Sequence, residues 1–176
     1  ENRSSAKARK LSSIKALFKY LVNKRGYLAV NPAANIDSPK KKKALPKYLT
    51  LEESVTLLET VAADRDSPHR VRDYAILTLF LNCGMRVGEL VSINLQDIDP
   101  QLRSLRVVGK GNKERMVYLN DSCKTAIKRY LEVRPHEGLT AESKNALFIS
   151  RNHKRISPRT VEHIVTSYIK KAGLDG

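Results

Sequence analysis

The sequence has few cysteines, no long apolar run and a shortage of acidic residues. Only Cys83 and Cys123 are present, and no cysteine–histidine cluster has zinc spacing, so neither a disulfide framework nor a metal site is expected. No run approaches the ~20 apolar residues of a membrane-spanning helix, and residues 1–10 are polar and basic, unlike a signal sequence. We therefore expect a cytoplasmic protein with no membrane partner.

The shortage of acidic residues leaves a strongly basic chain. Lys and Arg number 33 against 18 Asp and Glu, a net charge of +15 over 176 residues. Such a surplus is hard to explain for an enzyme of small metabolites and predicts a polyanionic partner. Nucleic acid is the commonest polyanion, although a ribosomal or membrane-surface protein fits the charge as well. With 41% hydrophobic residues, the chain can still form one domain, or one domain and part of another.

The first part of the chain predicts a helix followed by a linker. Apolar periodicity indicates an amphipathic helix over residues 5–25, which Gly26 would end. The opposite face of this helix is basic. It either contacts the phosphates of a nucleic-acid backbone or is simply solvated. Residues 38–47 contain two prolines and the run Lys40, Lys41, Lys42 and Lys43. This segment predicts an extended linker and a domain boundary, either as a solvated tether or as a direct DNA contact.

The remainder predicts a mainly α-helical domain with a small antiparallel β-hairpin, an α+β fold. Thr50 and Glu53 form a capping box at a helix start, and a central helix from about residue 67 would end at Gly84. Two short apolar runs flank a glycine-rich basic tip, which is typical of a hairpin. The other expected elements are a helix over 87–93, a loop over 97–103, the strands 105–108 and 115–119, a helix from 120 or 121 to 133, an extended stretch over 147–150 and a helix over 157–172.

Arg86 stands at a predicted helix start, directly after a glycine turn and between apolar helices. This is a costly place for a charge, because a buried guanidinium needs a carboxylate or a phosphate partner. Glu89 follows three residues later on the same helical face, where it can orient the arginine. An internal salt bridge between the two residues and a phosphate-binding arginine both explain the pattern.

The predicted hairpin tip carries Lys110 between Gly109 and Gly111. Glycines let a backbone approach a ligand closely, and the strands would hold the ammonium group forward. Lys113 and Arg115 add charge beside it. Taken alone, the tip is either a solvated turn or a DNA contact.

These segments resemble motifs of one known family. Residues 81–90 (LNCGMRVGEL) are similar to the box around the first catalytic arginine of the tyrosine recombinases, and residues 107–115 (VVGKGNKER) are similar to their catalytic-lysine hairpin. Residues 147–151 and the helix after them resemble the segment before the family's next box. The similarity, to the branch of bacterial Xer proteins and phage or transposon integrases, covers nearly the whole chain. It implies the last helix of a core-binding domain (1–37), a basic linker (38–47) and a partial catalytic domain with the recombinase fold (48–176).

The resemblance also implies roles for individual residues. Arg86 would hold the scissile phosphate, Glu89 would support Arg86, and Lys110 would enter the minor groove and protonate the departing 5′-hydroxyl. The family conserves bond energy in a phosphotyrosyl ester and needs no metal or cofactor. Its partners would be double-stranded DNA and further protomers, as a tetramer on DNA. Further DNA contacts are expected from Lys113, Arg115, Lys40, Lys41, Lys42 and Lys43.

In the family, further motifs lie downstream of the helix that corresponds to residues 157–172, and this sequence does not contain them. These are a His-x-x-Arg box, a further His or Trp, and the nucleophilic tyrosine. A literal His-x-x-Arg at residues 69–72 precedes Arg86 and is interpreted as coincidence. Tyr168 has core spacing, and Tyr118 and Tyr130 are interpreted in the same way, so none of the seven tyrosines qualifies as the nucleophile.

We therefore expect the chain to be a fragment that binds DNA without cleaving it, whereas the full-length parent carries out site-specific recombination. A covalent adduct trapped on a suicide substrate by the chain alone would contradict this expectation. Two alternatives remain: a non-catalytic DNA-binding accessory module that keeps the phosphate-holding surface, and a basic RNA-binding protein, which only the charge supports.

Overall fold

The computed structural model describes residues 4–39, 48–109 and 111–175, and it divides the chain into two compact units, Glu1–Tyr48 and Leu49–Gly176. In the first unit, α1 (Ser4–Asn23) confirms the predicted N-terminal helix. The segment after it folds back on α1, because Ala33 is buried and the Lys15 ammonium donates to the carbonyl of Ala34 at 3.2 Å. The predicted DNA contacts Lys40, Lys41, Lys42 and Lys43 lie outside the described residues.

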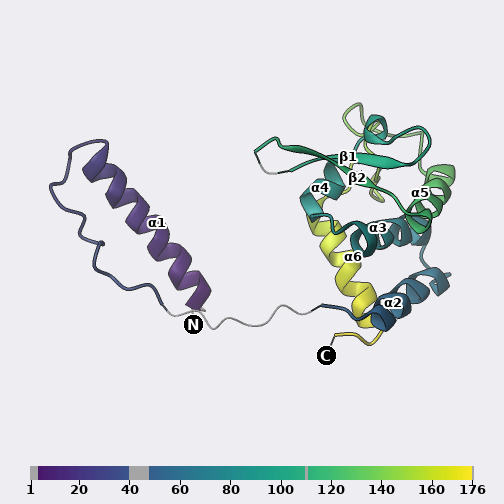
Figure 1. Ribbon diagram of the computed structural model, residues 1–176, viewed down its shortest axis with the longest axis horizontal. Coiled ribbons are helices and arrows are strands. Elements are labelled where there is room, and N and C mark those ends of the chain that lie inside the picture. The colour runs from purple at the N-terminus through teal and green to yellow at the C-terminus, as the bar shows by residue number, and fades with distance from the viewer. Residues whose placement is uncertain (1–3, 40–47, 110, 176) are drawn as a thin grey trace. The chain divides into compact units, whose positions relative to one another are not determined.

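The second unit is mainly helical and contains one two-stranded antiparallel sheet (Figure 1), which confirms the predicted fold class. Strands β1 and β2 pair with Ser104 opposite Tyr118 and Val108 opposite Glu114. The elements are α2 (Leu51–Ala63), α3 (Arg70–Cys83), α4 (Val87–Ser92), a 3₁₀ turn (Leu95–Asp97), β1 (Ser104–Val108), β2 (Glu114–Tyr118), α5 (Asp121–Val133) and α6 (Pro158–Lys171).

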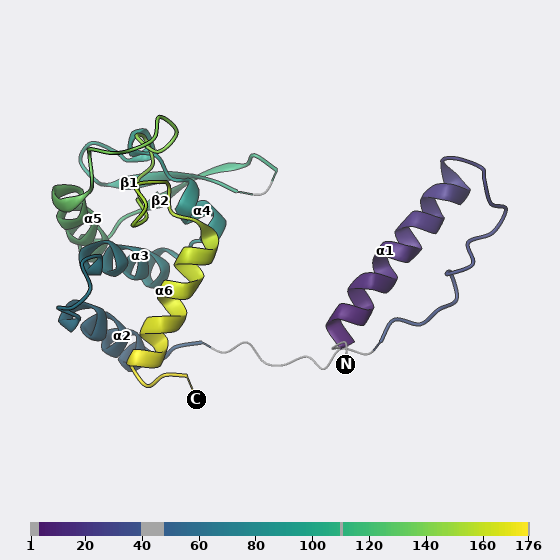
Figure 2. The same cartoon turned by 180° about the vertical axis from the view of Figure 1, so that it is seen from behind.

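Helix α3 lies at the centre of this unit and packs against α2, α5 and α6. Its apolar residues point in several directions, so that Ala75, Ile76 and Leu79 are all fully buried. Seen from behind, α6 runs from α4 to α2 along one side of the unit (Figure 2). Gly84 ends α3 with φ +56°, a left-handed conformation that glycine adopts without strain.

Local signals explain where the helices begin. The hydroxyl of Thr50 accepts the backbone N–H of Glu53 at 3.2 Å, and the Glu53 carboxylate accepts the N–H of Thr50 at 2.7 Å, so the predicted capping box is present. Asn120 and Ser157 cap α5 and α6 with their side chains. One element was missed: the 3₁₀ turn Leu95–Asp97 overlaps the start of the predicted loop.

Buried polar groups hold the segment between α5 and α6 in place. The Tyr130 hydroxyl accepts the backbone N–H of Ile149 at 3.0 Å, and its ring stacks on Phe148 with centroids 5.2 Å apart. The buried guanidinium of Arg134 donates to the carbonyls of Ala146 and Leu147. These contacts fix the chain that leads into α6, and the apolar pattern gave no sign of them.

Candidate functional site

Arg86 lies at the surface, immediately before α4. The prediction that its guanidinium is buried is wrong, because the side chain is 77% exposed. Gly84 turns the chain in the left-handed conformation and Arg86 is extended (φ −77°, ψ 149°), so the backbone leaves the core before α4 begins. The buried charge is instead that of Glu89, whose side chain is 3% exposed.

Glu89 binds the side chains of two arginines. Its Oε1 accepts from Nη1 of Arg86 and its Oε2 from Nη2 of Arg115, each at 2.9 Å. Oε2 also accepts the backbone N–H of Arg86 at 2.9 Å, which caps the start of α4. Burial opposes ionisation of Glu89, but the hydrogen bonds from Arg86 and the charge of Arg115 outweigh it and hold the pKa of Glu89 below its usual value. Glu89 is therefore an anion at neutral pH that orients two guanidinium groups.

The base of the hairpin lies against the same carboxylate. Strand β1 packs beside α4 (Figure 1), and Gly109 follows directly after it. A Cβ atom at Gly109 would come within 3.3 Å of Oε1 of Glu89, so only glycine allows this approach without displacing the carboxylate. The backbone N–H of Gly109 donates to the carbonyl of Lys113 at 2.8 Å and closes the base of the tip.

The predicted site residues therefore have different outcomes. Arg86, Glu89 and Arg115 come together, and Lys113 is exposed at the tip of the hairpin. Lys110 lies outside the described residues. The approach of Arg86 and Lys110 to one phosphodiester stays a prediction.

A second basic surface was not predicted. Near the start of α6, a hollow of about 650 Å³ is lined by several cations and hydroxyls. Its cations are Arg72, Arg151, Lys154, Arg155 and Arg159, and the imidazole rings of His69 and His163 also line it. The signal that could have revealed it is the basic run RNHKRISPR at residues 151–159, which also contains the predicted start of the last helix.

Two of the cations in this hollow are structural. The guanidinium of Arg155 donates to the carbonyls of Val91 and Ile93 and ties the loop before α6 to the end of α4. Arg72 is buried and donates to Asp73 at 2.8 Å and to the carbonyl of Ile149 at 2.9 Å. These contacts give the arginine of the literal His-x-x-Arg sequence a packing role.

The tyrosines differ in burial. Tyr168 is 4% exposed and its hydroxyl donates to Oδ2 of Asp64 at 3.0 Å, and burial raises the pKa of Tyr168 to about 12. Tyr130 is also buried, so the expected packing role is confirmed for both. For Tyr118 this expectation is wrong, because the residue is 82% exposed on β2.

Among the described residues, no group of three or more His, Cys, Asp or Glu residues is arranged to hold a metal ion. None of the helices described is long and apolar enough to cross a bilayer.

The chain is similar to known recombinases in sequence and structure. It is 49% identical over 175 residues to tyrosine recombinase XerC of Caldanaerobacter subterraneus subsp. tengcongensis, covering 99% of this chain and 47% of the relative. It is 39% identical over 170 residues to tyrosine recombinase XerC of Thermodesulfovibrio yellowstonii, covering 95% and 56%. The chain thus spans about half the length of these curated relatives.

Solved structures agree on the fold. The crystal structure of XerA recombinase matches with a TM-score of 0.63 and 26% identity, covering 100% of this chain and 65% of that one. XerH site-specific recombinase bound to palindromic difH substrate matches with a TM-score of 0.79 and 20% identity, covering 98% and 52%. The fold is that of a tyrosine-recombinase catalytic domain. The family model described as "Phage integrase family" matches residues 47–176. The chain belongs to this family, and the two XerC relatives are similar to it in sequence over nearly its whole length.

Proposed function

We propose that this chain is part of a site-specific DNA recombinase that cleaves and rejoins strands through a 3′-phosphotyrosyl intermediate. The observation that carries the proposal is the buried carboxylate of Glu89, which orients the exposed guanidinium of Arg86 beside the base of the hairpin that contains Lys110. Preorganised cations of this kind stabilise the charge that develops during phosphoryl transfer. The printed names of the relatives, tyrosine recombinase XerC, support the same reaction.

In this proposal the side chains have separate tasks. Arg86 contacts the non-bridging oxygens of the scissile phosphate, since its guanidinium is accessible and is hydrogen-bonded to Glu89. Glu89 is a positioning residue, because it is buried and acts through Arg86 and Arg115. Lys110 protonates the departing 5′-oxygen as a general acid.

The attacking tyrosine is proposed to come from a part of the protein outside these 176 residues. Tyr130 and Tyr168 are buried and hydrogen-bonded within the fold, and the chain spans about half the length of its curated relatives. Residues 48–176 would then be part of a catalytic domain, 38–47 a linker and 1–37 the last helix of a core-binding domain. In support, α1 leaves Ile14, Leu17 and Tyr20 about half exposed, as expected of a helix whose apolar face packs on further helices.

The proposed partners are double-stranded DNA and further protomers. A lambda integrase tetramer bound to a Holliday junction has the same fold, with a TM-score of 0.72 at 21% identity, covering 98% of this chain and 48% of that chain. The net charge of +15 and the basic hollow at the start of α6 support DNA binding. A protein with this role would work in the cytoplasm.

The covalent intermediate provides the direct test. A duplex is first selected from a random pool for tight binding to the full-length protein. It is then nicked close to the cleavage position, so that the short strand freed by cleavage diffuses away and cannot be rejoined. We expect a protein–DNA adduct that survives denaturation and carries DNA through its 3′-phosphate. Tight binding without any adduct across nicks at all positions would favour the non-catalytic accessory module instead.

The basic hollow makes a separate prediction about salt. Replacing Arg159 with alanine removes a cation near the start of α6, and the slope of log Kd against log salt should fall by about one. Fluorescence anisotropy with a labelled duplex measures this slope. Lys128→Ala is the matched control, because Lys128 is exposed on α5 and does not line the hollow. An equal change of slope in the two variants would exclude the hollow as a specific phosphate contact.

A further inference from the structure

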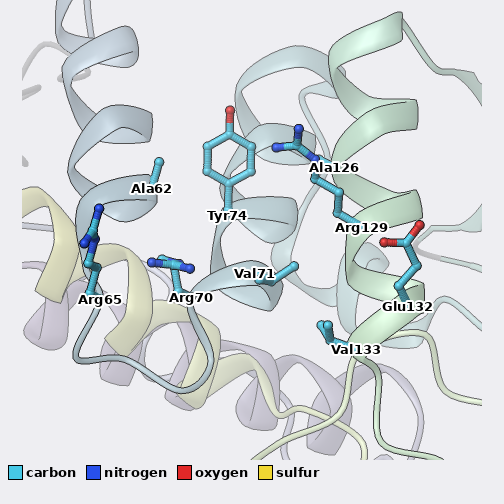
Figure 3. A pocket seen from close by; sticks show the side chains of 9 residues that line it. All are labelled: Ala62, Arg65, Arg70, Val71, Tyr74, Ala126, Arg129, Glu132 and Val133. Atoms are coloured by element: carbon cyan, nitrogen blue, oxygen red, sulfur yellow. The ribbon is translucent and has the colours of Figure 1, made fainter.

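A second pocket lies at the other end of α3 from Arg86. Helices α2, α3 and α5 enclose a groove of about 820 Å³ (Figure 3). The first residues of α3, from Arg70 on, line this groove, whereas Arg86 comes after the last residue of the helix, Cys83. A helix of 14 residues is roughly 20 Å long. The groove is therefore separate from the proposed phosphate site. Its lining residues are Ala62, Arg65, Arg70, Val71, Tyr74, Ala126, Arg129, Glu132 and Val133.

The groove carries an excess of positive charge. Arg65 and Arg70 line its α2 side and Arg129 lines its α5 side, with Tyr74 between them, while Glu132 is the one acidic residue of the lining (Figure 3). Within the described part of the chain, no ion pair and no side-chain hydrogen bond involves any of the three arginines. Guanidinium groups that converge on a concave surface favour carboxylate or phosphate ligands, which they bind in bidentate fashion.

The shape and the apolar surface of the groove favour a peptide over a duplex. Val71 and Val133 contribute apolar side chains to the lining, and Val133 remains 59% exposed. A duplex backbone presents a convex row of phosphates with no apolar group to cover these side chains. A groove formed by two helices above a third instead fits a segment with an apolar edge and acidic flanks, the helix-in-groove mode of recognition.

We propose that this groove binds an acidic segment of a partner protein. Its carboxylates would pair with Arg65, Arg70 and Arg129, and its apolar side chains would cover Val71 and Val133. The proposal does not depend on the proposed recombinase chemistry. It identifies a docking surface on the second unit, at the other end of α3 from Arg86. A partner can therefore bind there while Arg86 remains accessible.

The test uses the full chain and a short fluorescein-labelled helical peptide of glutamates with leucines along one edge. We expect anisotropy to show saturable binding that Arg70→Ala and Arg129→Ala each weaken by about tenfold, the effect of one charge-assisted hydrogen bond. Lys128→Ala, which removes the neighbouring exposed charge on α5, should leave the affinity nearly unchanged. A peptide with serines in place of the leucines should bind much more weakly.

Five outcomes would overturn the proposal. Absence of saturable binding would mean that the groove does not bind the peptide, and equal weakening by Arg129→Ala and Lys128→Ala would mean that only the overall charge attracts it. Equal binding of the serine peptide would exclude the apolar contact. Loss of duplex affinity in Arg129→Ala to the same extent as peptide affinity would make the groove a DNA surface. Dissociation of a dimer by Arg129→Ala without peptide would make a second copy of the chain the occupant. The test of the recombinase proposal by a covalent protein–DNA adduct is independent of all five.

Discussion

Replacing Arg86 with alanine in the full-length protein should slow strand cleavage by about a thousandfold or more, the range found when an arginine that stabilises transferring phosphate is removed. Duplex binding should fall far less, because the proposed binding would draw on many of the 33 Lys and Arg residues. The fold should survive, since the Arg86 side chain is 77% exposed. Single-turnover cleavage and duplex affinity, measured on the same preparation, separate the two effects.

The chain offers a close control for this variant. Arg103 is also an exposed arginine, 70% accessible, held by one carboxylate, that of Asp99 at 2.9 Å. It lies in the loop before β1, so Arg103→Ala removes a similar surface ion pair at another position. Its cleavage rate should stay close to that of the unchanged protein. A loss of binding as large as the loss of cleavage in Arg86→Ala would identify Arg86 as a structural arginine.

Much of the fold could be predicted because its signals are local. The Thr50–Glu53 capping box marks the start of α2, and Gly84 marks the end of α3 because the turn there is left-handed. The hairpin followed from two short apolar runs around a glycine-rich tip. The buried links of Tyr130 and Arg134 could not be predicted, because their partners are backbone atoms about ten to twenty residues further along the chain.

The contact between Arg86 and Glu89 could be predicted, but its geometry could not. Arg86 was expected to be buried and is exposed, and the buried charge is that of Glu89, since apolar neighbours in sequence do not show that the backbone leaves the core after Gly84. The third member, Arg115, reaches Glu89 from 26 residues away across the hairpin. The predicted contact of Arg115 with DNA would therefore compete with the ion pair between Arg115 and Glu89, which only the tertiary structure reveals.

Lys110 is the proposed general acid. Changing Lys110 to alanine should slow cleavage of an ordinary phosphodiester by about a hundredfold to ten-thousandfold, the contribution of a well-placed acid. A substrate with sulfur at the 5′-leaving position should lose much less, because a thiolate leaves without being protonated. Lys113→Ala is the control, since it removes an exposed cation from the same hairpin tip. It should affect both substrates alike.

The comparison of the two substrates isolates proton transfer from charge. If Lys110 only attracted DNA, its loss would slow both substrates by the same factor. Equal slowing would therefore contradict the role of Lys110 as acid. At the base of the hairpin, Gly109 lies so close to the Glu89 carboxylate that an added Cβ atom would stand 3.3 Å from Oε1. Replacing Gly109 by alanine would disturb that contact, so the acid is best tested at residue 110 itself.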